Sequence, residues 1–156
     1  MHVREAVIAD YQAVRNLLHD SDAYHARHVP AVARVPDEPR FTRDELTELL
    51  ANANCLVLVA EHEGMVVGFI EASIRVPERP DEVTMPWCGI NNLAVDDRWR
   101  RRGIGSALVE AAEAWARRKG LMQVRLEVFE FNSGARTLYE RLGYRTISRH
   151  MGKPLS

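Results

Sequence analysis

Residues 90–106 read Ile-Asn-Asn-Leu-Ala-Val-Asp-Asp-Arg-Trp-Arg-Arg-Arg-Gly-Ile-Gly-Ser, and the rest of the chain is arranged around them. The apolar beginning of this stretch predicts a strand, and Asp96 and Asp97 predict a turn directly after it. From Ile104 to Lys119 apolar residues recur at helical spacing. The stretch therefore predicts a strand, a basic loop that contains glycines, and a long helix, in that order.

The loop has the features of an anion-binding turn. Gly103 and Gly105 carry no side chain that would keep a ligand away from the backbone, and the first turn of the helix offers unpaired N–H groups. Arg98 and the run Arg100–Arg102 add positive charge. The loop is neither a P-loop, which ends in Gly-Lys-Ser/Thr, nor a dinucleotide fingerprint, because Leu108 stands where that fingerprint has its third glycine.

Two motifs point to one family. Arg100-x-x-Gly103-x-Gly105 resembles the pyrophosphate-binding motif of the GNAT superfamily of N-acetyltransferases, although many members have glycine where this chain has Arg101. Residues 132–144 resemble the second coenzyme motif of that family, with matches at Asn132, Ala135, Leu138, Tyr139, Glu140, Gly143 and Tyr144. The resemblance implies a mixed α/β (α+β) domain, in which helices flank a twisted, mostly antiparallel sheet.

The resemblance also implies a coenzyme site, with acetyl-coenzyme A as co-substrate and no metal. The peptide groups of 93–95 would pair with the pantetheine arm, the turn would hold the pyrophosphate, and Asn132 would hydrogen-bond the coenzyme. The expected cofactor-binding residues are Leu93, Ala94, Val95, Arg100, Arg101, Arg102, Gly103, Ile104, Gly105, Ser106 and Asn132.

The chemistry requires an acid and a base. Tyr139 is the expected acid, because the family places this tyrosine beside the coenzyme sulfur and a phenol can donate a proton to a thiolate. A base is needed because an amine with a pKa of about 10.4 is almost fully protonated at pH 7. Relatives often carry a glutamate on the central strand, which this chain lacks. Glu71 on the neighbouring strand is the first substitute, and Asp81 and Glu82 are the alternatives.

The remaining elements follow from local patterns. Residues Val3–Ile8 predict a strand, and Asp10 predicts a helix cap. Residues 19–40 predict a long segment that is irregular or partly helical. Thr42 with Glu45 forms a capping box for a second helix, and Glu63-Gly64 a hairpin turn between strands at 55–61 and 65–75. Residues 76–86 predict a loop. Later expected elements are a strand at 122–129, a short helix capped at Asn132 or Ser133, and a last strand at 145–151.

Composition sets the outer limits. A chain of 156 residues corresponds to one domain, 1–156, and its net charge of -1 argues against a general nucleic-acid binder. No membrane-spanning or signal segment is evident, and Cys55 and Cys88 lack metal or redox spacing, so we expect a cytoplasmic protein. The pair His25-x-x-His28 has no further metal ligands at suitable spacing, which argues against a metal site.

The expected activity is acetyl transfer to a primary amine by direct attack in a ternary complex, since Cys88 has no obvious activating partner. The acceptor is a small-molecule or protein amine, and acidic residues in the loops suggest a cationic one. Relatives often form homodimers. Two alternatives stay open: an enzyme that uses another acyl-coenzyme A, and a sensor or regulatory module that binds acyl-coenzyme A without catalysis.

Overall fold

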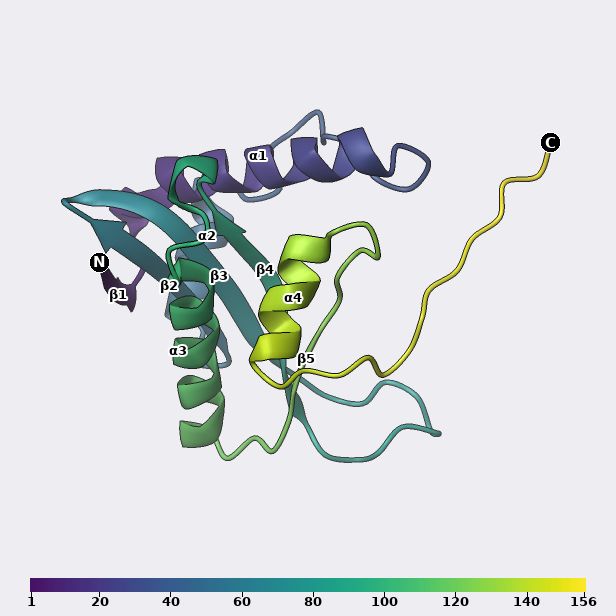
Figure 1. Cartoon of the computed structure of the whole chain (residues 1–156). Coiled ribbons are helices and arrows are strands. Elements are labelled where there is room, and N and C mark those ends of the chain that lie inside the picture. The colour runs from purple at the N-terminus through teal and green to yellow at the C-terminus, as the bar shows by residue number, and fades with distance from the viewer.

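A five-stranded sheet forms the centre of the computed structural model, which describes residues 1–156 (Figure 1). Its strands lie in chain order: β1 (His2–Glu5), β2 (Cys55–His62), β3 (Met65–Arg75), β4 (Trp87–Val95) and β5 (Val124–Leu126). The first four strands pair antiparallel, whereas β5 lies parallel to β4. The mostly antiparallel sheet with flanking helices confirms the predicted fold class.

Helices cover both faces of the sheet. They are α1 (Tyr11–His28), α2 (Arg43–Ala51), α3 (Ile104–Arg118) and α4 (Ser133–Arg141), with single 3-10 turns at Ile8–Asp10 and Asp97–Trp99. Side chains that alternate along β2 divide between the two faces, as expected for a strand buried on both sides. Leu56 and Leu58 belong to the core under α3, whereas Val57 and Val59 pack with α1 and α2. No helix in the structure has the length and apolar character needed to cross a membrane.

Several local predictions are confirmed. Thr42 and Glu45 form the expected capping box, with hydrogen bonds of 3.1 Å and 2.7 Å to each other's backbone N–H. Glu63 and Gly64 both have positive φ in the expected hairpin turn. These features depend on neighbouring residues alone, which is why the sequence reveals them.

The expectations for the first helix were partly wrong. The first strand ends at Glu5 instead of Ile8, and α1 continues to His28, into the segment predicted to be irregular or partly helical. Asp10 precedes α1 but makes no side-chain cap hydrogen bond to it. Its carboxylate instead accepts hydrogen bonds from Arg4 and from the N–H of Val7. The extra length of α1 rests on packing against Phe131, a residue far away in the sequence.

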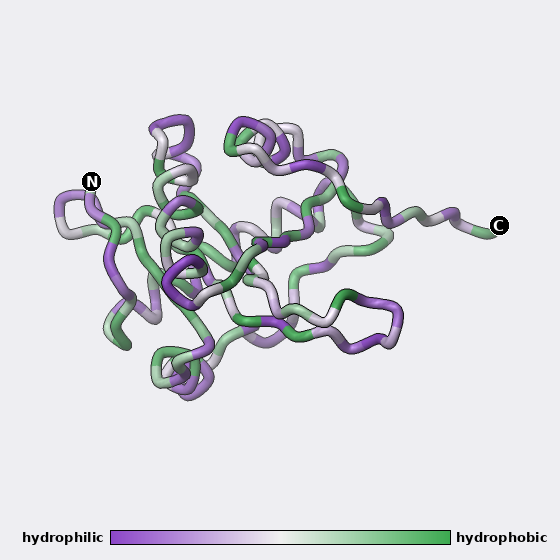
Figure 2. The backbone as a smooth tube through the Cα atoms, turned by 90° about the horizontal axis from the view of Figure 1, so that it is seen from below, coloured by the Kyte–Doolittle hydropathy of each residue, from purple (hydrophilic) through white to green (hydrophobic).

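The expectations for the last strands were also wrong in part. The strand predicted at 122–129 contains only three residues, and 145–151 form no strand. Residues 145–156 are exposed throughout and leave the body of the molecule as an extended segment (Figure 2). A strand needs a neighbour for its backbone hydrogen bonds, and in one chain these residues have none.

Candidate active site

The site begins where two neighbouring strands separate. β5 pairs with β4 only from Cys88 to Ile90, opposite Val124 to Leu126. Beyond Ile90, β4 is paired with β3 alone, so residues 91–95 have one side without a strand partner. Leu93, Ala94 and Val95, which were predicted to bind an extended ligand, lie on this half of β4 and are half-buried. The gap between β4 and β5, called the slot below, offers the unpaired peptide groups that such a ligand needs.

An anion-binding turn follows the slot. Gly103 stands at the start of α3 with φ of 78°, and no side chain caps the helix. The first-turn N–H groups of Ile104, Gly105 and Ser106 are therefore free for a ligand, at the positive end of the helix. A Cβ atom at Gly105 would lie 3.1 Å from Cδ2 of Leu138 in α4. The second glycine of the motif thus also lets α4 pack against the beginning of α3.

The arginines of the turn differ in their surroundings. Arg98 pairs with Asp96 and Arg100 with Asp97, each at 2.7 Å. The Arg98 hydrogen bond lowers the pKa of Asp96, so this carboxylate stays charged and continues to hold its partner. Arg102 lies over the ring of Trp99, at 4.8 Å from its centroid. Arg101, with φ of 59°, is exposed and forms no ion pair, which leaves its charge available to a ligand.

Glu71, the predicted base, is buried among neutral groups. The residue is 6% exposed, and its Val57 partner places it on the α1 and α2 face of the sheet. Asn91 donates to one carboxylate oxygen at 2.7 Å, and Asn92 donates to the other at 2.8 Å. No Arg, Lys or His forms an ion pair with it. The carboxylate is oriented by two donors and still lacks a cation.

A β-bulge brings the two asparagines together. Glu71 is opposite Asn92 and Ala72 is opposite Ile90, so Asn91 is an extra residue in β4. Consecutive residues of a regular strand point to opposite faces, but a bulge can direct both to one side. Asn91 is held in turn by Arg75, which donates to its carboxamide oxygen. Gly89 makes room for that arginine, since a Cβ atom there would lie 2.9 Å from Cγ of Arg75.

Tyr139, the predicted acid, lies on the other face, in the core that includes α3. The residue is 8% exposed, and burial raises the pKa of its phenol to about 12. No protein group hydrogen-bonds its hydroxyl, yet no buried polar side-chain atom lacks a partner. Its hydroxyl oxygen is therefore not fully buried. Tyr139 and Glu71 lie on opposite faces of the sheet and do not contact each other.

An aromatic cluster at the end of α1 was missed by the sequence reasoning. Its members come from α1 and from the connection after β5: Tyr24, His25, His28, Phe129 and Phe131. His28 stacks on Phe131 with ring centroids 4.6 Å apart, and burial lowers the pKa of His25. The histidines thus pack against phenylalanines. No sequence signal connects two segments a hundred residues apart.

The other predicted residues have local roles in this structure. Asn132 caps α4 by accepting a hydrogen bond from the N–H of Ala135 at 3.2 Å. Asp81 pairs with Arg79, and Glu82 accepts a hydrogen bond from the N–H of Glu78. Cys88 is fully buried, and burial raises the pKa of its thiol to about 11. A thiol that stays protonated at neutral pH is a poor nucleophile.

Comparison with known proteins agrees with this geometry. A sequence model of the acetyltransferase (GNAT) family matches residues 14–144. A mycothiol acetyltransferase of Salinispora arenicola is 36% identical over 138 residues, which cover 85% of this chain and 43% of that protein. The chain thus spans less than half the length of this relative. An aminoglycoside N(6')-acetyltransferase of Acinetobacter genomosp. 13 is 26% identical, with 96% of this chain and 92% of that protein covered.

Solved structures show the same fold. A mutant of the BH1408 protein from Bacillus halodurans superposes with a TM-score of 0.91 at 25% identity, with both chains fully covered. An aminoglycoside 6'-N-acetyltransferase from Acinetobacter haemolyticus gives a TM-score of 0.72 at 22% identity, again over the whole of both chains. These solved structures therefore share the fold of this chain.

Proposed function

The chain belongs to the GNAT acetyltransferase family, and from this premise we propose that it transfers an acetyl group from acetyl-coenzyme A to a primary amine. The observation that carries the proposal is the slot, in which an unpaired half of β4 leads directly to the uncapped beginning of α3. A peptide-like arm that ends in a pyrophosphate fits these two features together. The names of the relatives support an amine as the acceptor.

The protein residues fit the two proton transfers of such a reaction. Acetyl-coenzyme A would supply the acetyl group as a thioester. Glu71 would bind the ammonium form of the acceptor and remove its proton, directly or through a water molecule. The neutral amine nitrogen then forms a bond to the carbonyl carbon, loses its second proton to water, and the carbon–sulfur bond breaks. Tyr139 would give its proton to the departing thiolate, and a backbone N–H of Leu93 or Val95 would stabilise the carbonyl oxygen.

A cationic acceptor fits the charge of the site. Glu71 is held by two neutral carboxamides, so an ammonium group that enters the site would be its only direct cationic partner. Burial strengthens such a pairing because less water surrounds the charges. We therefore propose cationic amines, such as small polyamines or aminoglycoside-like compounds, ahead of neutral acceptors.

Thermal unfolding with candidate ligands tests the binding step. Acetyl-coenzyme A or coenzyme A at about a hundred times the dissociation constant should add about 2.7 kcal/mol to the free energy of unfolding. For a domain of this size the melting temperature should rise by about 5 to 10 °C, and ATP should have little effect. Arg101→Glu should reduce the shift, whereas Arg118→Glu at the far end of α3 should not. Equal shifts with ATP, or no shift at all, would refute the coenzyme site.

A further inference from the structure

Arg75 lies next to one of the two asparagines that hold Glu71. It is an exposed residue at the end of β3, on the same face of the sheet as Glu71, because the two residues are four positions apart in one strand. Its guanidinium donates a hydrogen bond to Oδ1 of Asn91, and no carboxylate forms an ion pair with it. The positive charge of Arg75 is therefore directed at a neutral carboxamide.

The carboxamide of Asn91 has one favourable orientation. Its Nδ2 donates to Oε1 of Glu71 at 2.7 Å and to Oγ of Ser73 at 3.0 Å, so both N–H groups are used. Its Oδ1 accepts the hydrogen bond from Arg75. A flipped carboxamide would point its oxygen at the carboxylate and its N–H groups at the guanidinium, and both contacts would be repulsive. Arg75 thus holds Asn91 in the orientation that donates to Glu71.

The path of the Arg75 side chain depends on Gly89. This glycine of β4 is opposite Ser73 of β3. A Cβ atom at position 89 would lie 2.9 Å from Cγ and 3.0 Å from Nε of Arg75, which is closer than ordinary van der Waals contact. Any side chain there would force Arg75 to move. The absence of a side chain at Gly89 therefore lets Arg75 reach Asn91 across the sheet.

This indirect arrangement leaves the carboxylate of Glu71 available to a ligand. Arg4, by contrast, donates directly to both oxygens of Asp10. Arg75 acts through one carboxamide, and a donor to the oxygen of an amide makes the N–H groups of that amide stronger donors. The charged form of Glu71 is favoured in this way, while the space for a cationic acceptor stays free.

We propose that Arg75 is a positioning residue, which acts through Asn91 to keep the carboxylate of Glu71 oriented and charged for the acceptor. The inference rests on the proposed function, in which Glu71 binds the amine and removes its proton. Arg75 itself would contact neither the amine nor acetyl-coenzyme A. Cys55, on the neighbouring strand β2, does not supply a charge in its place. Burial and the charge of Glu71 raise the pKa of the Cys55 thiol, which therefore stays neutral at neutral pH.

Arg75→Met tests the proposal by removing the charge and the donor together. We expect kcat/KM for an amine acceptor to fall by about 10-fold, the effect of one hydrogen bond that involves a charged group. The acid limb of the pH profile of kcat/KM should move to higher pH by about 0.5 unit, because the carboxylate of Glu71 is protonated more easily without the positive charge. Arg75→Lys should keep most of the activity and the wild-type pH profile. Gly89→Ala should reproduce the effect of Arg75→Met.

Arg125→Met is the matched control. Arg125 lies opposite Gly89 on β5, and its guanidinium packs over the ring of Trp87 at 4.1 Å from the centroid. It carries the same charge beside the same part of the sheet but forms no hydrogen bond with Asn91. Its removal should leave the pH profile unchanged. Equal shifts of the profile in both variants, or wild-type kinetics in Arg75→Met, would overturn the proposal.

Nuclear magnetic resonance of the side-chain amides tests the contact without any reaction. Both Nδ2 protons of Asn91 are hydrogen-bonded in the wild type, so we expect two resolved signals, one of them moved downfield by the carboxylate. Arg75→Met should move these signals toward those of a free asparagine, whereas Arg125→Met should not. Unchanged Asn91 signals in Arg75→Met would refute the proposal. If the wild type transfers no acetyl group to any amine, the proposed function fails, and these signals alone decide whether Arg75 holds Asn91.

Discussion

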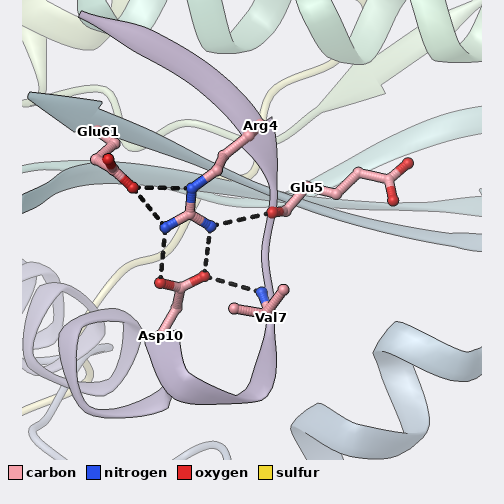
Figure 3. Close-up of polar contacts among 5 residues, drawn as sticks. All are labelled: Arg4, Glu5, Val7, Asp10 and Glu61. Atoms are coloured by element: carbon pink, nitrogen blue, oxygen red, sulfur yellow. Dashed lines mark hydrogen bonds and ion pairs between the residues drawn. The ribbon is translucent and has the colours of Figure 1, made fainter. Parts of the chain in front are cut away.

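Two carboxylates are buried in this protein, and they differ in the charge of their partners. Asp10 is 7% exposed and Glu71 is 6% exposed. Arg4 donates to both oxygens of Asp10, at 2.8 Å and 3.0 Å, and also pairs with Glu61 on β2 (Figure 3). Glu71 receives hydrogen bonds only from the carboxamides of Asn91 and Asn92. The two carboxylates are thus buried to the same extent, but only Asp10 has a positively charged partner.

This difference agrees with a structural role for Asp10 and with the proposed functional role of Glu71. Asp10 lies among donors that include a full positive charge, and it joins β1 to the turn before α1. A buried charge that is already paired contributes to the fold and has little capacity left for a ligand. Glu71 is held in place by two hydrogen bonds but has no positively charged partner. A cationic ligand would supply that partner. Substitutions at the two sites should consequently affect different properties.

Glu71→Gln should have the largest effect on activity. Glutamine keeps the shape of the side chain but cannot take a proton, so kcat/KM for an amine acceptor should fall by about 10³-fold, within the usual range for a general base. The melting temperature should change little. Steady-state kinetics with acetyl-coenzyme A and an amine measures this effect, and Glu61→Gln is the matched control. A variant with normal kcat/KM would remove Glu71 from the reaction.

Tyr139→Phe tests the opposite face of the site. Loss of the hydroxyl should lower kcat by about 100-fold while the affinity for acetyl-coenzyme A stays nearly constant, because the acid acts only when the thiolate leaves. Burial raises the pKa of Tyr139 to about 12, so the phenol remains protonated throughout the assay range. Tyr144→Phe is the control, since it should cost about 1 kcal/mol of stability and leave kcat unchanged. Unchanged turnover in Tyr139→Phe would contradict the assignment.

Arg4→Met tests the structural role of the Arg4–Asp10 ion pair. Removal of the guanidinium leaves Asp10 buried without its cation, and since Arg4 is partly exposed we expect a loss of about 2 to 3 kcal/mol of stability. Chemical denaturation measures this loss. Arg79→Met removes an ion pair of similar length, 2.7 Å, at an exposed position, and should cost less than about 1 kcal/mol. Similar losses in both variants would refute the special status of the Arg4 cluster.

The same cluster predicts a small pH effect on stability. Burial favours the neutral form of Asp10, but the hydrogen bonds from Arg4 and from the N–H of Val7, together with the charge of Arg4, outweigh it and lower the pKa of Asp10 below its ordinary value of 3.8. A depressed pKa means that the contribution is complete above the ordinary value and is lost as the pH falls through the folded-state value. Denaturation followed from about pH 4 downward should therefore show a steeper loss for the wild type than for Arg4→Met. Parallel curves would show that Asp10 is not the responsible group.

The turn and the helices of the proposed coenzyme site could be predicted because their signals are local. Gly103, Gly105 and the periodic helix after them lie within one short stretch, and Tyr139 belongs to a second motif of the same kind. Backbone conformation at turns and helix ends depends on residues nearby in the chain, so both can be predicted from the sequence.

The acceptor side could be predicted only in part. Glu71 was expected near the site because adjacent strands meet, but the bulge at Asn91 that gives it two donors has no sequence signature. The aromatic cluster depends on contacts between α1 and the segment after β5. The strand predicted at 145–151 is absent from the structure for a related reason. A strand needs a neighbouring strand for its hydrogen bonds, and the sequence does not say where that neighbour lies.

Acetyl transfer to an amine panel tests the central claim most directly. Release of coenzyme A thiol is followed with acetyl-coenzyme A and matched acceptors that differ in charge, from neutral amines to polyamines and aminoglycosides. We expect thiol release that depends on an amine, is fastest with cationic acceptors and is nearly lost in Glu71→Gln. Tight binding of acetyl-coenzyme A without amine-dependent release from any acceptor would contradict the account and favour a protein that binds the coenzyme without catalysis.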